Sequence, residues 1–138
     1  MLRNPNVILL STNETETADL REGLSKHVIV TPARNLVELS SLLEKASYDA
    51  LFCAWSFHTG SWNEALEEVH KYGLDLPVII FSSTAEEREW LRVLEAGAFD
   101  LLVPPYQDRA LLAVIEQASA SRTALAARRI EPLLNAAV

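Results

Sequence analysis

The sequence has one cysteine, four glycines and six prolines among its 138 residues. The single cysteine, Cys53, excludes an internal disulfide, and no set of Cys and His residues has the spacing of a zinc site. The scarcity of Gly and Pro excludes a collagen-like or low-complexity chain. No apolar run approaches the roughly 20 residues that span a bilayer, and no signal-peptide pattern follows Met1. We therefore expect a cytoplasmic protein that does not enter a membrane.

Basic side chains are also scarce, because 12 Lys and Arg stand against 19 Asp and Glu and give a net charge of -7. Such an acidic surface repels phosphate backbones, which excludes direct, non-specific binding of nucleic acid. Residues 1–120 hold nine basic and eighteen acidic side chains, whereas residues 121–138 hold three basic and one acidic. This change predicts a domain over residues 1–120 and a C-terminal helical extension or linker over residues 121–138.

Hydrophobic residues make up 49% of the chain and gather in five short runs, at residues 7–10, 28–30, 50–54, 78–81 and 99–103. These runs are continuous rather than alternating, which is typical of parallel strands buried on both faces. The segments between them carry apolar residues at helical spacing. Three of the predicted inward faces are Leu36, Leu39, Leu42 and Leu43; Leu91, Leu94 and Ala98; and Leu111, Val114, Ile115 and Ala118. The alternation predicts an α/β fold of five βα units, in which helices cover both faces of a doubly wound parallel five-stranded sheet, a three-layer α/β/α sandwich.

The signals for helix ends agree with this pattern. Two predicted capping boxes are Ser61 with Glu64 and Ser83 with Glu86. Gly73 and Gly97 stand where helices would end in the left-handed conformation. In an open parallel sheet, ligands bind outside the carboxyl ends of the strands, so any site should follow those ends.

Four segments together resemble response-regulator receiver domains. They are Val7–Leu10, Tyr48–Cys53, Pro77–Ser83 and Glu95–Val103. The resemblance covers roughly residues 5–120 and implies a flavodoxin-like sheet with strand order 2-1-3-4-5. It also implies a role in two-component, phosphorelay signalling.

The family holds Mg²⁺ with two acids after the first strand and phosphorylates an Asp at the end of the third strand. A Ser or Thr after the fourth strand and a Lys after the fifth grip the phosphoryl oxygens. At the matching positions this sequence has Ser11 and Thr12 for the acids, Ala54 for the phosphoacceptor, Ser82 for the hydroxyl, Pro104 for the lysine, Pro105 for the proline that follows it, and Leu101 for the switch aromatic. Only Ser82 and Pro105 keep the family pattern.

Ala54 has no lone pair with which to attack a phosphoryl group, and neutral hydroxyls are weak Mg²⁺ ligands. We therefore expect a pseudo-receiver that is not an enzyme and binds no cofactor, its Mg²⁺ site being lost. Its function would be phosphorylation-independent protein–protein interaction or dimerisation. The expected partner is a histidine kinase, another regulator or its own output domain, and we expect a homodimer. The alternative is a small-molecule or cofactor binding module that uses the strand-end crevice.

Five aromatic residues are candidates for the interaction: Trp55, Phe57, Trp62, Trp90 and Tyr106. The first three flank the degenerate pocket and could pack the loop onto the third helix, fill the vacant space, or form a recognition patch. Trp90 lies in an acidic stretch of the fourth predicted helix, where an exposed ring would suit an interface.

Other residues near the strand ends have ordinary explanations beside functional ones. Cys53 could be a redox sensor or a small buried hydrophobe. Glu14 could face the pocket or charge the first turn of a helix. Ser56 and His58 lack an orienting acid for nucleophilic catalysis. Asp49 and Asp100 precede their strands and belong to the other end of the sheet.

The last predicted helix could run past residue 120, because Arg122, Leu125 and Arg129 continue its stripe. A helix of that kind could form a dimer seam, and Pro132 would end or kink it.

Overall fold

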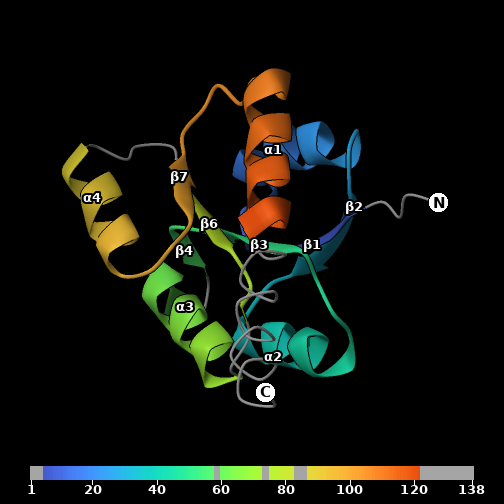
Figure 1. Ribbon diagram of the computed structural model, residues 1–138. Coiled ribbons are helices and arrows are strands. Elements are labelled where there is room, and N and C mark those ends of the chain that lie inside the picture. The colour runs from blue at the N-terminus through green and yellow to red at the C-terminus, as the bar shows by residue number, and fades with distance from the viewer. Residues whose placement is uncertain (1–4, 58–59, 73–74, 83–86, 122–138) are drawn as a thin grey trace, which may run out of the picture.

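The computed structural model describes residues 5–57, 60–72, 75–82 and 87–121. Figure 1 shows the elements in chain order. They are β1 (Asn6–Leu10), α1 (Glu14–Ser25), β2 (Ile29–Ala33), α2 (Leu36–Lys45), β3 (Ala50–Ala54), β4 (Ser56–Phe57), β5 (Gly60–Ser61), α3 (Trp62–Lys71), β6 (Val78–Phe81), α4 (Glu87–Glu95) and β7 (Asp100–Leu102). Residues 108–121 form a further helix, here called the C-terminal helix.

The main sheet has five strands in the order β2-β1-β3-β6-β7, and every neighbouring pair is parallel. Without the small β4–β5 hairpin, this is the order 2-1-3-4-5. The predicted α/β fold and strand order are therefore confirmed. The charge-based boundary near residue 120 stays a prediction, because residues 122–138 lie outside the described residues.

Helices cover both faces of the sheet. Alternate side chains of each strand point to opposite faces, so Leu51 and Cys53 join the cluster under α2, α3 and α4. Ala50, Phe52 and Ala54 join the cluster under α1 and the C-terminal helix. All five residues of β3 are buried, which explains why its sequence is a continuous apolar run.

Strand β2 is shifted from its predicted position at residues 28–30. It runs from Ile29 to Ala33 and includes Pro32, which pairs with Leu9. An edge strand tolerates proline because one side of its backbone forms no ladder hydrogen bonds. The prediction rested on runs of apolar residues, and it missed this extension because Thr31 and Pro32 interrupt the apolar run.

One predicted helix face was wrong at Leu91, whereas Leu94 is half-buried and Ala98 is buried. Leu91 is 48% exposed, whereas the unpredicted Val93 is fully buried under the sheet. Helix α4 ends at Glu95, so Ala98 belongs to the turn before β7 rather than to the helix. In contrast, Leu111, Val114, Ile115 and Ala118 are all buried as predicted.

The structure agrees with some of the predicted helix ends and differs from others. Ser61 is the N-cap of α3, but its side chain makes no capping hydrogen bond, so the capping box with Glu64 was wrong. Asn35, which was not predicted, caps α2 by accepting a hydrogen bond of 2.9 Å from Glu38 N at its Oδ1. Gly97 has the expected positive φ of 107°. Ser83, Glu86 and Gly73 lie outside the described residues.

The Asp49 carboxylate accepts a hydrogen bond of 2.8 Å from Asn6 N, where β1 begins. Asp100 begins β7. Both acids therefore lie at the amino-terminal edge of the sheet, away from the strand ends, as predicted. Among the described residues, no helix has the length and apolar character needed to cross a membrane.

Candidate functional site

The carboxyl ends of the central strands bring the predicted site positions to one edge of the sheet. Ala54 pairs with Phe81, the last residue of β6, and Phe81 pairs with Leu102, the last residue of β7. Ser82 follows directly and donates its backbone N–H to Leu102 O at 3.0 Å. Ser11 follows β1 at the same edge and donates its N–H to Ala33 O. Sequence positions far apart in the chain thus meet where the receiver resemblance places its site.

The hydroxyls after β1 are engaged by their own loop. Thr17, which is buried in α1, donates from Oγ1 to Asn13 O at 2.6 Å. Its proton is then committed, so Ser11 Oγ must donate to Thr17 Oγ1, 2.6 Å away. Ser11 Oγ also accepts a hydrogen bond of 3.3 Å from Asn13 N. A neutral chain of hydroxyls takes the place that the family gives to metal-binding acids.

Ala54 presents a methyl group at the end of β3. It is only 6% exposed and packs in the cluster that contains Phe52 and Phe81. Ser82 is buried, whereas Pro104 and Pro105, joined by a cis peptide bond, are exposed. Leu101 is 8% exposed and packs in the opposite cluster. The edge therefore offers one buried hydroxyl and no charged group at these positions.

The residues at this edge do not fit Mg²⁺, which the family binds through carboxylates. Ser11, Thr12 and Ala54 supply no carboxylate. Glu14 lies exposed in the first turn of α1, which agrees with the interpretation that it charges a helix start. Within the described part of the chain, no three His, Cys, Asp or Glu side chains are grouped to hold a metal ion.

A small hairpin carries the aromatic residues next to this edge. β4 and β5 pair antiparallel, and the hairpin connects β3 to α3. The rings of Trp55 and Trp62 have centroids 5.6 Å apart and planes tilted by 49°. Trp62 is 2% exposed and Phe57 is 7% exposed, and both belong to the cluster under α3. Of the three predicted roles, the structure supports packing of this loop against α3.

The Arg92 guanidinium of α4 lies over the Trp62 ring, with Cζ 6.0 Å from the ring centroid. A cation at this distance is attracted by the face of an indole. The contact ties α4 to Trp62, the first residue of α3. Sequence reasoning missed it, because nothing in the spacing of residues 62 and 92 indicates that they meet.

Cys53 is fully buried, and its thiol donates to Ala54 O at 3.3 Å. Burial raises the pKa of the Cys53 thiol far above its ordinary range, because the thiolate would lose its hydration. This environment supports the small buried hydrophobe and not the redox sensor. His58 lies outside the described residues, and Ser56 is an exposed residue of the hairpin.

Three large apolar side chains on α4 and just after β7 are exposed. Trp90, Leu91 and Val103 are 41%, 48% and 46% exposed. Helix α4 packs against β7, and Trp90 Nε1 lies 3.5 Å from Asp100 Oδ1. We call these three residues the α4–β7 surface. Tyr106, the remaining interaction candidate, is half-buried against the cluster under α1 and the C-terminal helix.

A cavity of about 340 Å³ borders Pro104, Pro105 and Tyr106. Its other walls come from α1, from Lys26 and from Asp108. The Asp108 carboxylate also accepts a hydrogen bond of 2.8 Å from His27 Nε2 if that nitrogen is protonated. The alternative function, a ligand in the strand-end crevice, stays a prediction.

The fold and the position of the site define an α/β protein of the receiver class. The family model described as the response regulator receiver domain matches residues 11–116, and the chain belongs to this family. No match to the chain is found among curated proteins.

Solved structures of receiver domains share the fold at low sequence identity. A putative response regulator from Chloroflexus aurantiacus J-10-fl has a TM-score of 0.76 at 20% identity, over 86% of this chain and 99% of the other. The beryllofluoride-activated NtrC4 receiver domain dimer has 0.75 at 16%, over 85% and 98%. The receiver domain of the histidine kinase PA1611 from Pseudomonas aeruginosa PAO1, which has magnesium in its active-site cleft, has 0.73 at 18%, over 86% and 99%.

Proposed function

We propose that this receiver domain acts in two-component signalling without being phosphorylated, as a cytoplasmic protein–protein interaction module that forms a homodimer. On this proposal it is not an enzyme, and it binds neither Mg²⁺ nor nucleic acid. The observation that carries the proposal is the buried methyl group of Ala54 at the end of β3.

The chemistry of the edge explains why phosphorylation is not expected. Phosphoryl transfer to a carboxylate brings two anionic groups together, so it needs a nucleophile, a bound metal cation and a further positive charge nearby. Ala54 supplies no nucleophile, the hydroxyls of Ser11 and Thr17 bond to each other, and Pro104 supplies no cation. All three requirements fail at once, and Ser82 alone cannot replace them.

The loss of the phosphoacceptor and of the groups around it also affects how the domain could be regulated. A ligand shifts a conformational equilibrium only by its different affinity for the two states. Without a phosphoacceptor at residue 54, no phosphoryl group is held where Ser82 could contact it, so phosphate offers no such difference. The domain would keep one conformation or change it only on binding a protein.

The α4–β7 surface is the candidate for that protein contact. Trp90 and Leu91 are neighbours on α4, and Val103 follows β7, an edge strand of the sheet. When a partner covers half-exposed aromatic and aliphatic side chains, apolar surface is removed from water, and this favours binding. A second copy of this chain can bring the same surface, as the symmetry of most homodimers requires.

Two measurements test the proposal. Intact mass after incubation with Mg²⁺ and acetyl phosphate should show no gain of a phosphoryl group in residues 48–60. Light scattering should show a dimer of the full chain, and the double variant Trp90→Ser with Leu91→Ser should be a monomer.

The matched control is Val37→Ser, which removes an apolar side chain that is 79% exposed on α2. This variant should remain a dimer. A phosphoryl group on residues 48–60 would overturn the first half of the proposal. A monomeric wild type, or a dimer that survives the α4 double variant, would overturn the second.

A further inference from the structure

Two neighbouring cavities lie at the amino-terminal edge of the sheet, opposite the strand-end site. The larger, of about 380 Å³, has apolar walls from Leu66, Leu76, Pro77 and Phe99 and a polar rim that includes His70 and Asp75. The smaller, of about 320 Å³, shares Asp75 and Leu76 with the larger. We call the two cavities together the amino-edge groove.

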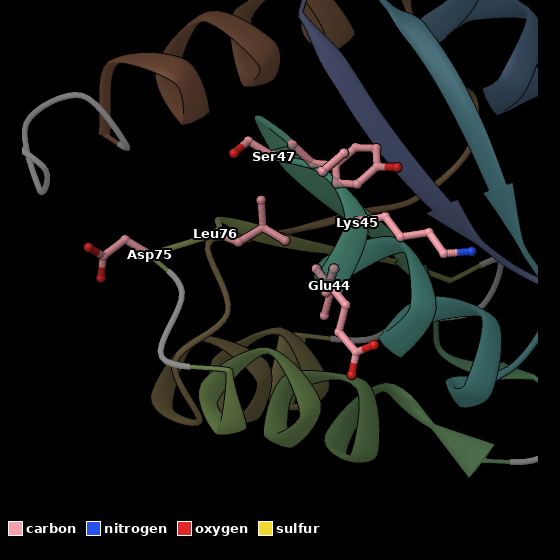
Figure 2. A pocket seen from close by; sticks show the side chains of 8 residues that line it. Glu44, Lys45, Ser47, Asp75 and Leu76 are labelled. Atoms are coloured by element: carbon pink, nitrogen blue, oxygen red, sulfur yellow. The ribbon is translucent and has the colours of Figure 1, made fainter.

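The smaller cavity is formed where α2 ends and β3 begins. Figure 2 shows Glu44, Lys45 and Ser47 on one side and Asp75 and Leu76 on the other, and the Asp75 carboxylate points away from the other labelled residues. The Glu44 carboxylate accepts a hydrogen bond from the Tyr72 hydroxyl. Leu43 and Tyr48, each 7% exposed, form its apolar floor. The groove thus has a buried apolar floor and a rim with two carboxylates, Glu44 and Asp75, and one lysine, Lys45.

The C-terminal helix delivers the chain to this groove. Ser121, the last described residue, is itself one of the residues that line the larger cavity. The chain continues for 17 residues, 122–138, which we call the tail. The tail has four large aliphatic side chains, Leu125, Ile130, Leu133 and Leu134, and three arginines with one glutamate.

We propose that the tail binds along the amino-edge groove of its own chain. Its leucine and isoleucine side chains would cover the apolar floor, and its arginines would face Glu44 and Asp75. Three features of the chain favour the tail over other occupants of the groove.

The first reason is covalent attachment. Because Ser121 lines the groove, residue 122 starts at its wall, and a short tether gives an effective concentration in the millimolar range. The second is length. Seventeen residues reach about 25 Å as a helix and at least twice that when extended, which exceeds the size of either cavity.

The third reason is charge. The chain up to residue 120 has twice as many acidic as basic side chains, whereas the tail has three arginines against one acid. Attraction between opposite charges favours the tail over an acidic partner for the same groove. This inference is independent of the proposed function, because it concerns neither phosphorylation nor the α4–β7 surface.

The test uses the full chain with a nitroxide label on Ala136→Cys. Cys53 needs no replacement, because it is fully buried. In a uniformly ¹⁵N-labelled sample, the amide signals of His70, Gly97 and Phe99 should lose most of their intensity. The amides of Ser11 and Ser82, at the other edge of the sheet, should keep theirs.

The double variant Leu133→Asp with Leu134→Asp, carrying the same label, should restore the groove signals. Its matched control, Asn135→Asp with Ala137→Asp, adds the same two charges without removing a leucine and should leave the broadening unchanged. All four substituted positions follow residue 121, so neither variant removes a side chain of the described core.

Three results would overturn the proposal. Groove signals that stay as intense as those of Ser11 would show that the tail is elsewhere. Equal loss of broadening in the control variant would show that charge alone, and not the apolar floor, is responsible. Broadening of a ¹⁵N chain by a labelled, unenriched second copy would show a contact between chains instead.

Discussion

The indole of Trp62 lies against that of Trp55 with ring centroids 5.6 Å apart, while the backbone N–H of Trp62 donates to Trp55 O at 3.1 Å. The same two residues therefore close the hairpin twice, once through the backbone and once through the rings. Arg92 adds a contact from α4 on the Trp62 ring. This pair holds Trp62, the first residue of α3, against Trp55, which follows Ala54 at the end of β3.

Replacing Trp62 by Ala should lower the free energy of unfolding by about 3–5 kcal/mol, because a fully buried indole leaves a cavity that its neighbours fill only partly. Replacing Trp90 by Ala, where the ring is 41% exposed, should cost well under about 1 kcal/mol. Urea denaturation of both variants checks this contrast. Equal losses would contradict the assignment of Trp62 to the core and Trp90 to the surface.

The position of Ala54 gives a second prediction. Ala54→Asp introduces the family's phosphoacceptor. It also places a carboxylate among apolar side chains, with no metal or lysine to compensate its negative charge. We expect a loss of about 2–4 kcal/mol at pH 7, since a buried charge without a partner is costly. The loss should be smaller at pH 4, where the carboxyl takes up a proton.

Ala54→Asn is the matched control, because it has the same size and no charge. Its loss should not change with pH in this way. Phosphorylation of Ala54→Asp by acetyl phosphate, at a rate typical of a functional receiver, would show that the other lost groups are dispensable.

The strands show how far the sequence alone could predict this fold. Strands β3 and β6 begin and end at the predicted residues, because a parallel strand buried on both faces is a continuous apolar run. The β4–β5 hairpin was not predicted, because strands of two residues are too short to show any periodicity. The inward face of α4 could not be predicted either, because Trp90 and Leu91 are apolar but exposed.

At the site, residue identities predicted which groups are missing, but not what replaces them. Threonine in a helix commonly donates a hydrogen bond to the carbonyl four residues earlier, as Thr17 does. This bond could therefore have been predicted from the sequence. The bond from Ser11 to Thr17 needs the turn between β1 and α1, whose shape the sequence does not specify.

Gly97 gives a third prediction. Its φ of 107° is strained for any residue with a Cβ atom, although an added Cβ would make only ordinary van der Waals contact, with His70 Cε1 at 3.7 Å. Gly97→Ala should therefore cost about 1–3 kcal/mol through the backbone alone. Gly60→Ala, which meets only the mobile carboxylate of Glu64, should cost less. Thermal denaturation of both checks the order, and a larger loss at Gly60 would contradict it.

Tyr72 gives a prediction about pH. Its pKa is raised above the usual value of 10.0, chiefly because its hydroxyl donates a hydrogen bond of 2.7 Å to Glu44 Oε1, and also by desolvation and nearby carboxylates. A raised pKa in the folded state stabilises the protein below the unfolded pKa, and this contribution is lost as pH rises through the folded pKa.

The wild type should therefore lose unfolding free energy relative to Tyr72→Phe as the pH rises above about 10. Urea denaturation at about pH 8 and at about pH 10.5 measures this difference. Glu44→Gln removes the carboxylate and should reduce the pH dependence of the comparison. Parallel curves for wild type and Tyr72→Phe across this range would contradict the hydrogen bond to Glu44.

Cys53 gives the last prediction. Because burial raises the pKa of its thiol and shields it from solvent, a thiol reagent should modify it only when the chain unfolds. Its rate at about pH 8 should then rise with urea in parallel with the unfolded fraction. Ser47→Cys places a second thiol at an exposed position, which should react at once in the folded protein while Cys53 does not. Fast modification of Cys53 in the native wild type would show that β3 opens locally, and would return the redox interpretation of this residue to consideration.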